Sequence, residues 1–129
     1  MTLNVVLDTS VLIAPDRPLG VTAAISVVSI SELHFGVLAA ADDEERARRV
    51  ARLGEVEATF DPLPITVAVA REWGRLSAAV RNRGGQPRRR AADLAIAATA
   101  NTYGVPLLTH NTGDFAIIDD LVDVRSPVS

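Results

Sequence analysis

The chain has 129 residues, 48% of them hydrophobic, and a net charge of −3 at pH 7. This size and composition predict one globular domain over residues 1–129 and exclude a disordered chain. The chain lacks cysteine and lysine, which excludes disulfides, thiolate metal sites and lysine-dependent P-loop or Schiff-base chemistry. We recognise no signal peptide and no apolar run of membrane-spanning length, so we expect a cytoplasmic protein without a membrane partner.

The first predicted element is a short buried strand that ends in a carboxylate. In Asn4–Ile13 (NVVLDTSVLI), β-forming residues precede Asp8, and Thr9 and Ser10 then lead into a helix. In an open α/β sheet, ligands bind beyond the carboxyl ends of the strands. Asp8 is therefore either a functional carboxylate at such an edge or the N-cap of the following helix.

A second strand and helix bring a second acid. After a loop over Ala14–Gly20, the pattern predicts a strand over Ala23–Val28. The motif S-I-S-E that begins at Ser29 matches a capping box that opens a helix. Glu32 therefore has two interpretations: it is the partner of the Ser29 cap, or it is a second carboxylate just past a strand.

Two long helices are predicted next. The first covers Asp42–Phe60, and the second begins at Thr66, its cap, and ends at about Asn82, with a minimal strand at Leu63–Ile65 between them. The first is charged and amphipathic, and we expect it to form a helical hairpin with the helix before it. Its acids lie four residues before arginines, Glu44 before Arg48 and Glu45 before Arg49. In the second helix, Trp73 lies on the apolar face, which favours a core or dimer contact over base stacking.

An arginine-rich segment follows. Arg81–Arg90 (RNRGGQPRRR) carries five arginines in ten positions, and its glycines and proline predict a flexible loop. It is either a solvated charged segment or a contact for a phosphate backbone, because arginine binds phosphate in a bidentate manner. In the second case Arg88, Arg89 and Arg90 are the candidate contacts for a nucleic-acid backbone.

The last part of the chain carries two more acids. Asp93 falls in the first turn of a small-residue helix, where the helix dipole alone favours an anion. Asp114 lies in a polar turn after an apolar strand. The predicted elements are a helix over Ala91–Tyr103 ending at Gly104, strands over Val105–Thr109 and Val122–Arg125, and a polar turn over His110–Phe115.

The four acids share one pattern. Asp8, Glu32 and Asp114 each follow a predicted strand, and Asp93 opens the helix that leads into one. With right-handed connections, these ends lie along one edge of the sheet. Carboxylates gathered there repel one another unless a cation lies between them, and Mg²⁺ or Mn²⁺ prefers oxygen ligands. Such a site can activate water to cleave a phosphodiester. The absence of cysteine and of paired histidines argues against zinc; we interpret His34 and His110 as structural or peripheral.

Four segments, VVLDTSVLI, SISELHFG, AADLAIAATA and LLTHNTGDF, together resemble the PIN domain, and specifically the toxin ribonucleases of VapBC-type toxin–antitoxin pairs. The resemblance covers nearly the whole chain. It implies a three-layer α/β fold with a mainly parallel sheet of four or five strands flanked by helices. It also implies that Asp8, Glu32, Asp93 and Asp114 bind Mg²⁺ or Mn²⁺ and that a metal-activated water cleaves RNA.

The resemblance implies further roles and partners. Thr9 or Ser10 would hydrogen-bond the Asp8 region or a substrate phosphate, and Asn111 matches a polar position that supports the last motif. The implied partners are an RNA substrate, a small VapB-like antitoxin whose C-terminal segment fills the groove, and a second copy in a homodimer. Two departures stand out: alanines precede Asp93 where a polar residue is common, and His110 stands where arginine is frequent.

Other classes of protein also fit part of the pattern. A phospho-acceptor receiver domain has a similar size and clustered acids, but it needs paired acids after its first strand and a late lysine, and this chain has neither. A catalytically silent PIN scaffold is a second alternative, against which the presence of all four acids argues. A nuclease that acts on DNA is a third, because a metal–carboxylate site alone does not distinguish the sugars.

Overall fold

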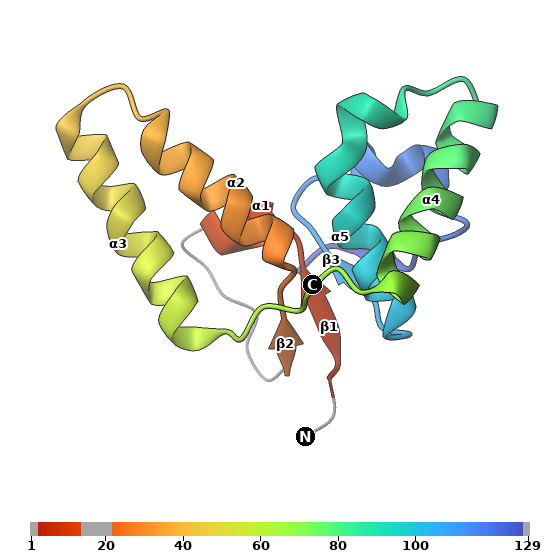
Figure 1. The fold of residues 1–129 in the computed structure, drawn as a ribbon, viewed down its shortest axis with the longest axis horizontal. Coiled ribbons are helices and arrows are strands. Elements are labelled where there is room, and N and C mark those ends of the chain that lie inside the picture. Colours follow the sequence, from red (N-terminus) through yellow and green to blue (C-terminus); the bar gives the residue numbers. More distant parts are fainter. Residues whose placement is uncertain (1–2, 14–21, 128–129) are drawn as a thin grey trace.

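Four short parallel strands form the centre of the computed structural model, which describes residues 3–13 and 22–127. The strands lie in the order β2-β1-β3-β4, and the first three of them are labelled in Figure 1. They are β1 (Val5–Leu7), β2 (Ala23–Ala24), β3 (Leu107–Leu108) and β4 (Val124–Arg125). All three pairings are parallel, which confirms the predicted fold class.

The central strand β1 divides the interior into two apolar cores. Val6 enters one core together with Leu107 of β3, whereas Val5 and Leu7 enter the other together with Leu108. This alternation follows from the two-residue period of a strand, whose successive side chains point to opposite faces. Each face therefore needs its own cover, and the result is a three-layer arrangement.

Helices cover both faces of the sheet (Figure 1). One side carries α1 (Thr9–Ile13) and the helical hairpin of α2 (Val27–Leu38) and α3 (Asp43–Thr59), which confirms the predicted hairpin. The other side carries α4 (Val67–Asn82) and α5 (Ala91–Thr102). In α5 every residue from 94 to 100 is buried, because its alanines allow close packing against α4.

Several local predictions are confirmed. Thr66 caps α4 through its side chain as predicted, and the structure adds that Asp42 caps α3 in the same way. Gly104 follows the end of α5 with a φ of +67°, the left-handed conformation that glycine adopts without strain. Trp73 is partly buried and packs against the core on the α4–α5 side. In the part of the chain that the structure describes, no helix has the length and apolarity to cross a membrane.

The start of α2 differs from the prediction. The helix begins at Val27 rather than after Ser29, because Ser26 is extended and its hydroxyl accepts a hydrogen bond from the backbone of Val28. β2 accordingly ends at Ala24. Ser29 is fully buried inside the helix, so it is not a cap, and Glu32 lies in the second helical turn rather than at a strand end. The capping-box interpretation of Glu32 was therefore wrong.

Two segments predicted as loops contain 3-10 helices. Pro87–Arg90 forms η1, which runs directly into α5, so the three arginines lie on regular structure rather than on a flexible loop. The predicted turn around Asp114 is part of η2 (Thr112–Ile118), which is held down by the buried Phe115 and Ile118. The predicted strand at Leu63–Ile65 is reduced to one parallel bridge between Leu63 and Ser26. The predicted loop at Ala14–Gly20 lies outside the described residues.

Candidate active site

The four acids come from four separate elements around the carboxyl edge of the sheet. Asp8 directly follows the central strand β1, and its backbone N–H continues the ladder by donating to Leu108 at 2.8 Å. Glu32 lies in α2, Asp93 in the first turn of α5, and Asp114 in η2. Asp8 is almost fully buried and Asp114 is exposed, so the site extends from the interior to the surface.

Two hydroxyl groups hold Asp8 in place. Ser10 Oγ and Thr109 Oγ1 each donate to Asp8 Oδ2 at 2.8 Å. The hydroxyls are oriented in turn by backbone donors, the N–H of His110 to Ser10 and the N–H of Asn111 to Thr109, both at 3.0 Å. Each hydroxyl has a single proton and donates it to Asp8. The Ser10 and Thr109 oxygens lie 3.2 Å apart, but neither has a proton left to donate to the other.

The carboxylate of Asp8 does not act as the helix cap that the sequence also allowed. The first turn of α1 is closed by the backbone carbonyl of Asp8, which accepts from Val11 N–H at 3.0 Å. Oδ2 is occupied by the two hydroxyls, and no described residue donates to Oδ1. One carboxylate oxygen is therefore oriented by the protein and the other is left available for a ligand.

Glu32 is held by a second hydroxyl pair. Thr9 Oγ1 donates to Glu32 Oε1 at 2.6 Å, and Ser29 lies 2.8 Å from the same Thr9 oxygen. Since the Thr9 proton goes to Glu32, Ser29 is the donor in its contact with Thr9. The chain Ser29→Thr9→Glu32 thereby connects α1 to α2 and fixes the direction of the carboxylate.

The other two acids are bridged by a cation of the chain itself. Arg90, the last residue of η1, lies 3.6 Å from Asp93 and 3.4 Å from Asp114, with its nitrogen Nη1 common to both pairs. The Arg90 side chain is 43% exposed. This half of the site is held together by charge rather than by hydroxyl groups.

The four carboxylates interact electrostatically. Burial, together with the negative charges of Asp8, Glu32 and Asp114, raises the pKa of Asp93 to about 6, against the opposing effect of Arg90. A carboxyl group surrounded by other carboxylates resists ionisation because like charges in a poorly solvated site repel one another. A cation bound among them would relieve this repulsion.

The donor set suits a hard divalent cation such as Mg²⁺ or Mn²⁺, since all four candidate ligands are carboxylates. Among the described residues, however, no three acidic or histidine side chains lie at the spacing of ligands around one ion. The acids are close enough to shift a pKa but not close enough to share an ion in this conformation, in which Arg90 lies between two of them. Binding of one ion by three or more of these acids would require the side chains to rearrange.

The remaining predicted site residues lie at the rim. Asn111 is exposed, and it is its backbone N–H, not its amide group, that joins the network around Asp8. Arg88 and Arg89 are exposed on η1 and form no ion pair with any described residue, unlike Arg90. His34 and His110 are exposed as well.

Sequence reasoning missed Thr109 and Ser29. Both are fully buried hydroxyl residues: Thr109 bonds Asp8, which follows β1, and Ser29 bonds Thr9 of α1. A polar residue at the end of a buried strand, as in VPLLT, was the available signal for Thr109. For Ser29 the signal was hidden by its match to a capping motif.

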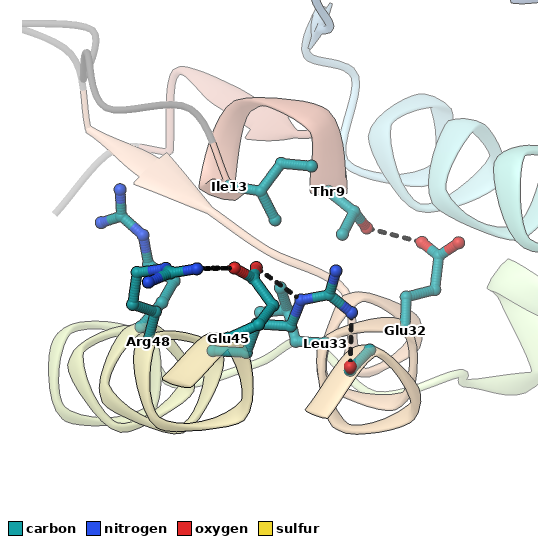
Figure 2. Close-up of a pocket in the computed structure, with 9 residues that line it drawn as sticks. Thr9, Ile13, Glu32, Leu33, Glu45 and Arg48 are labelled. Carbon is teal, nitrogen blue, oxygen red and sulfur yellow. Dashed lines mark hydrogen bonds and ion pairs between the residues drawn. The ribbon is translucent and has the colours of Figure 1, made fainter. Parts of the chain in front are cut away.

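A pocket of about 640 Å³ adjoins the Glu32 side of the site, between α1, α2 and α3 (Figure 2). Thr9 and Glu32 lie at one end, joined by their hydrogen bond, and Ile13 projects over the middle. Arg49 of α3 donates to the carbonyl of Gly36 at 2.7 Å, which joins α3 to α2, and it also donates to Glu45 of its own helix at 3.0 Å. The lining also includes Leu33, Gly36, Glu45, Arg48, Arg49 and Arg52.

The chain matches a known family over most of its length. A family model described as the PIN domain matches residues 5–121. The chain belongs to the PIN-domain family, as its four motifs predicted.

Individual relatives narrow the assignment to the VapC group. The chain is 40% identical over 132 residues to Ribonuclease VapC5 of Mycobacterium tuberculosis, covering 93% of this chain and 91% of that protein. It is 36% identical to Ribonuclease VapC4 of the same organism, covering 88% and 90%. A crystal structure of VapBC-5 from M. tuberculosis, a member of the VapBC family of toxin–antitoxin systems, superposes with a TM-score of 0.79 at 39% identity and covers 94% of both chains.

Proposed function

We propose that this chain is a metal-dependent endoribonuclease that acts as the toxin of a type II toxin–antitoxin pair. The observation that carries the proposal is the meeting of four carboxylates from four elements, with Asp8 preorganised at the end of the central strand. The names of the relatives VapC5 and VapC4, both ribonucleases, support RNA as the substrate.

In the proposed mechanism, Asp8, Glu32, Asp93 and Asp114 hold Mg²⁺ or Mn²⁺. The bound metal supplies a polarised water and charge stabilisation for cleavage of the phosphodiester. Ser10 and Thr109 keep one oxygen of Asp8 directed away, so that Oδ1 faces the ligand, and Thr9 does the same for Glu32. Arg88 and Arg89 are free to bind phosphates of the RNA that leads away from the site.

The test is cleavage of a structured RNA pool by the purified chain with Mg²⁺, with Mn²⁺, and with excess chelator. Asp8→Asn keeps the size of the side chain and removes its charge, and Asp61→Asn is the control because Asp61 is an exposed acid in the connection between α3 and α4, outside the four elements that carry the site. We expect metal-dependent cleavage that the Asp8 variant loses by at least about 100-fold and the control retains. Equal cleavage by the wild type and Asp8→Asn would contradict the assignment of the site.

The alternatives give different results in the same assay. A silent PIN scaffold predicts no cleavage by any variant and no heat of Mn²⁺ binding in calorimetry. A DNA-directed enzyme predicts cleavage of single-stranded DNA of the same sequence in place of RNA. Metal binding with cleavage of RNA alone supports the proposal.

The proposed partner is a small VapB-like antitoxin, supported by the likeness to the VapBC-5 structure. The pocket beside Glu32 is the candidate surface, because it is continuous with the acidic site through Thr9. Its exposed Ile13, together with Phe35 and Leu38 of α2, offers apolar contacts, whereas Arg48 and Arg52 of the lining are already paired with acids of α3. A segment of apolar residues would complement this surface and cover the site.

Capture of the partner by the tagged chain from its own host tests this surface. We expect one small protein to co-purify with the wild type and to be lost with Ile13→Glu, which places a charge in the apolar part of the pocket. Tyr103→Glu is the control, since Tyr103 is an exposed hydrophobic residue at the end of α5 on the other face of the sheet. Retention of the partner by Ile13→Glu would place the antitoxin elsewhere.

A homodimer and a cytoplasmic location are also part of the proposal. The homodimer rests on the family resemblance. Sedimentation equilibrium of the chain alone tests the first: a mass of twice that of one chain is expected, and a single-chain mass across the concentration range would contradict it.

A further inference from the structure

Arg90 stands apart from the other arginines of its segment. Arg88 and Arg89 extend into solvent, whereas Arg90 Nη1 lies between Asp93 and Asp114, at 3.6 and 3.4 Å. The three residues are consecutive on one 3-10 helix, so their different surroundings follow from the direction in which η1 enters α5. The side chain that turns inward is the one nearest to the acids.

We propose that Arg90 is a built-in counter-ion of the acidic site, which holds Asp93 and Asp114 together in the metal-free protein and competes with the divalent cation for them. This rests on the proposed metal site. Arg90 is then a positioning residue: it sets how tightly the metal binds, and it does not contact the reacting atoms.

Arg90 and the metal ion compete because both positive charges would lie against the same two carboxylates. A metal ion held by Asp93 and Asp114 would need the space and the oxygen lone pairs that the Arg90 guanidinium now faces. Two cations placed within a few ångströms of each other repel, and partial exposure weakens but does not remove that repulsion. The guanidinium must therefore move outward, into solvent, when the metal enters.

The test is calorimetric titration of the full chain with MnCl₂ at pH 7.5, for the wild type, Arg90→Gln and Arg89→Gln. Arg89 is the matched control, because it lies on the same helix, carries the same charge and has no acidic partner among the described residues. We expect Arg90→Gln to bind Mn²⁺ about three- to thirty-fold more tightly than the wild type and Arg89→Gln to bind within about two-fold. Arg90→Lys should restore most of the wild-type affinity.

A second measurement separates competition from a purely structural role. In chelator, Arg90→Gln should lower the melting temperature, because Asp93 and Asp114 lose their counter-ion; saturating Mn²⁺ should remove the difference from the wild type. Equal Mn²⁺ affinity in the wild type and Arg90→Gln, or weaker binding in Arg90→Gln, would overturn this inference alone. Absence of Mn²⁺ binding by the wild type would overturn the metal site and this inference with it.

Discussion

The two halves of the acidic site are built by different means. Asp8 and Glu32 are held by neutral hydroxyl groups, from Ser10 and Thr109 in one case and Thr9 in the other, at distances of 2.6 to 2.8 Å. Asp93 and Asp114 are instead held through the charge of Arg90, at 3.4 to 3.6 Å.

The difference follows from burial. Asp8 lies at the buried end of the central strand, where an unpaired charge is costly and short hydrogen bonds to a carboxylate are strong. Asp114 is 48% exposed, and water there weakens an ion pair while leaving the side chains able to move. The hydroxyl-held half is thus a rigid base for a ligand, and the arginine-held half is the part that can rearrange when one binds.

The largest effect on stability should come from removing a hydroxyl of the rigid half. Thr109→Val keeps the shape of this fully buried side chain but leaves Asp8 with one donor and the N–H of Asn111 without its acceptor. We expect it to lower the free energy of unfolding by about 2–3 kcal/mol, measured by urea denaturation. RNA cleavage should fall by about ten-fold or more, because the direction of Asp8 is lost.

Thr112→Val is the control for that change, since Thr112 is exposed at the start of η2. It should alter the free energy of unfolding by less than about 0.5 kcal/mol. If Thr109→Val is as stable as this control, the Thr109 hydroxyl does not hold Asp8 in place.

In the arginine-held half, a substitution is expected to raise the free energy of unfolding rather than lower it. Asp93→Asn removes a carboxylate that burial and three other acids make costly to ionise, so it should stabilise the metal-free protein at pH 7.5 by about 1–2 kcal/mol. The measurement is urea denaturation in chelator. Destabilisation of that size would mean that the pair with Arg90 outweighs the repulsion.

The stabilisation expected for Asp93→Asn should also depend on pH in a defined direction. The pKa of Asp93 is about 6 in the folded state against 3.8 as its ordinary value, so the folded protein holds this proton more tightly than the unfolded chain. The contribution of Asp93 to stability is therefore full below about pH 4 and is lost as the pH rises to about 6. The difference between Asp93→Asn and the wild type should shrink toward zero on going from pH 7 to pH 4.

Local patterns in the sequence predict the elements that carry the acids, but not the contacts that join those elements. The strand before Asp8, the helix that carries Asp93 and the caps at Thr66 and Gly104 follow from local patterns, and the structure has them. The contact between Asp8 and Thr109 joins residues 101 positions apart and depends on the pairing of β1 with β3, which no local pattern specifies. Ser26 and Ser29 are both fully buried, and it is the extended backbone of Ser26, with its hydroxyl accepting from the N–H of Val28, that makes Ser26 rather than Ser29 the cap of α2.

A smaller effect is expected at Glu32. Thr9→Val removes the donor to Glu32 and the acceptor for Ser29, but both residues of the Thr9–Glu32 pair are partly exposed to water, which can replace the lost bond. We expect a loss of about 1 kcal/mol in the free energy of unfolding, and Thr9→Ser, which keeps the hydroxyl, should restore it. Equal losses in both variants would point to packing of the methyl group instead.

The smallest effect on the fold should come from the two arginines that neither half uses. Arg88→Ala with Arg89→Ala removes two exposed side chains without an ion pair among the described residues, so the free energy of unfolding should change by less than about 0.5 kcal/mol. If both contact RNA phosphates, the slope of log K against log salt should become shallower by about 1.4, the value for two contacts to a single strand. Arg90→Ala should change this slope less, because Arg90 is directed at Asp93 and Asp114. An unchanged slope in the double variant would show that η1 is solvated surface, and a larger change for Arg90 would mean that its guanidinium leaves the acids for the RNA.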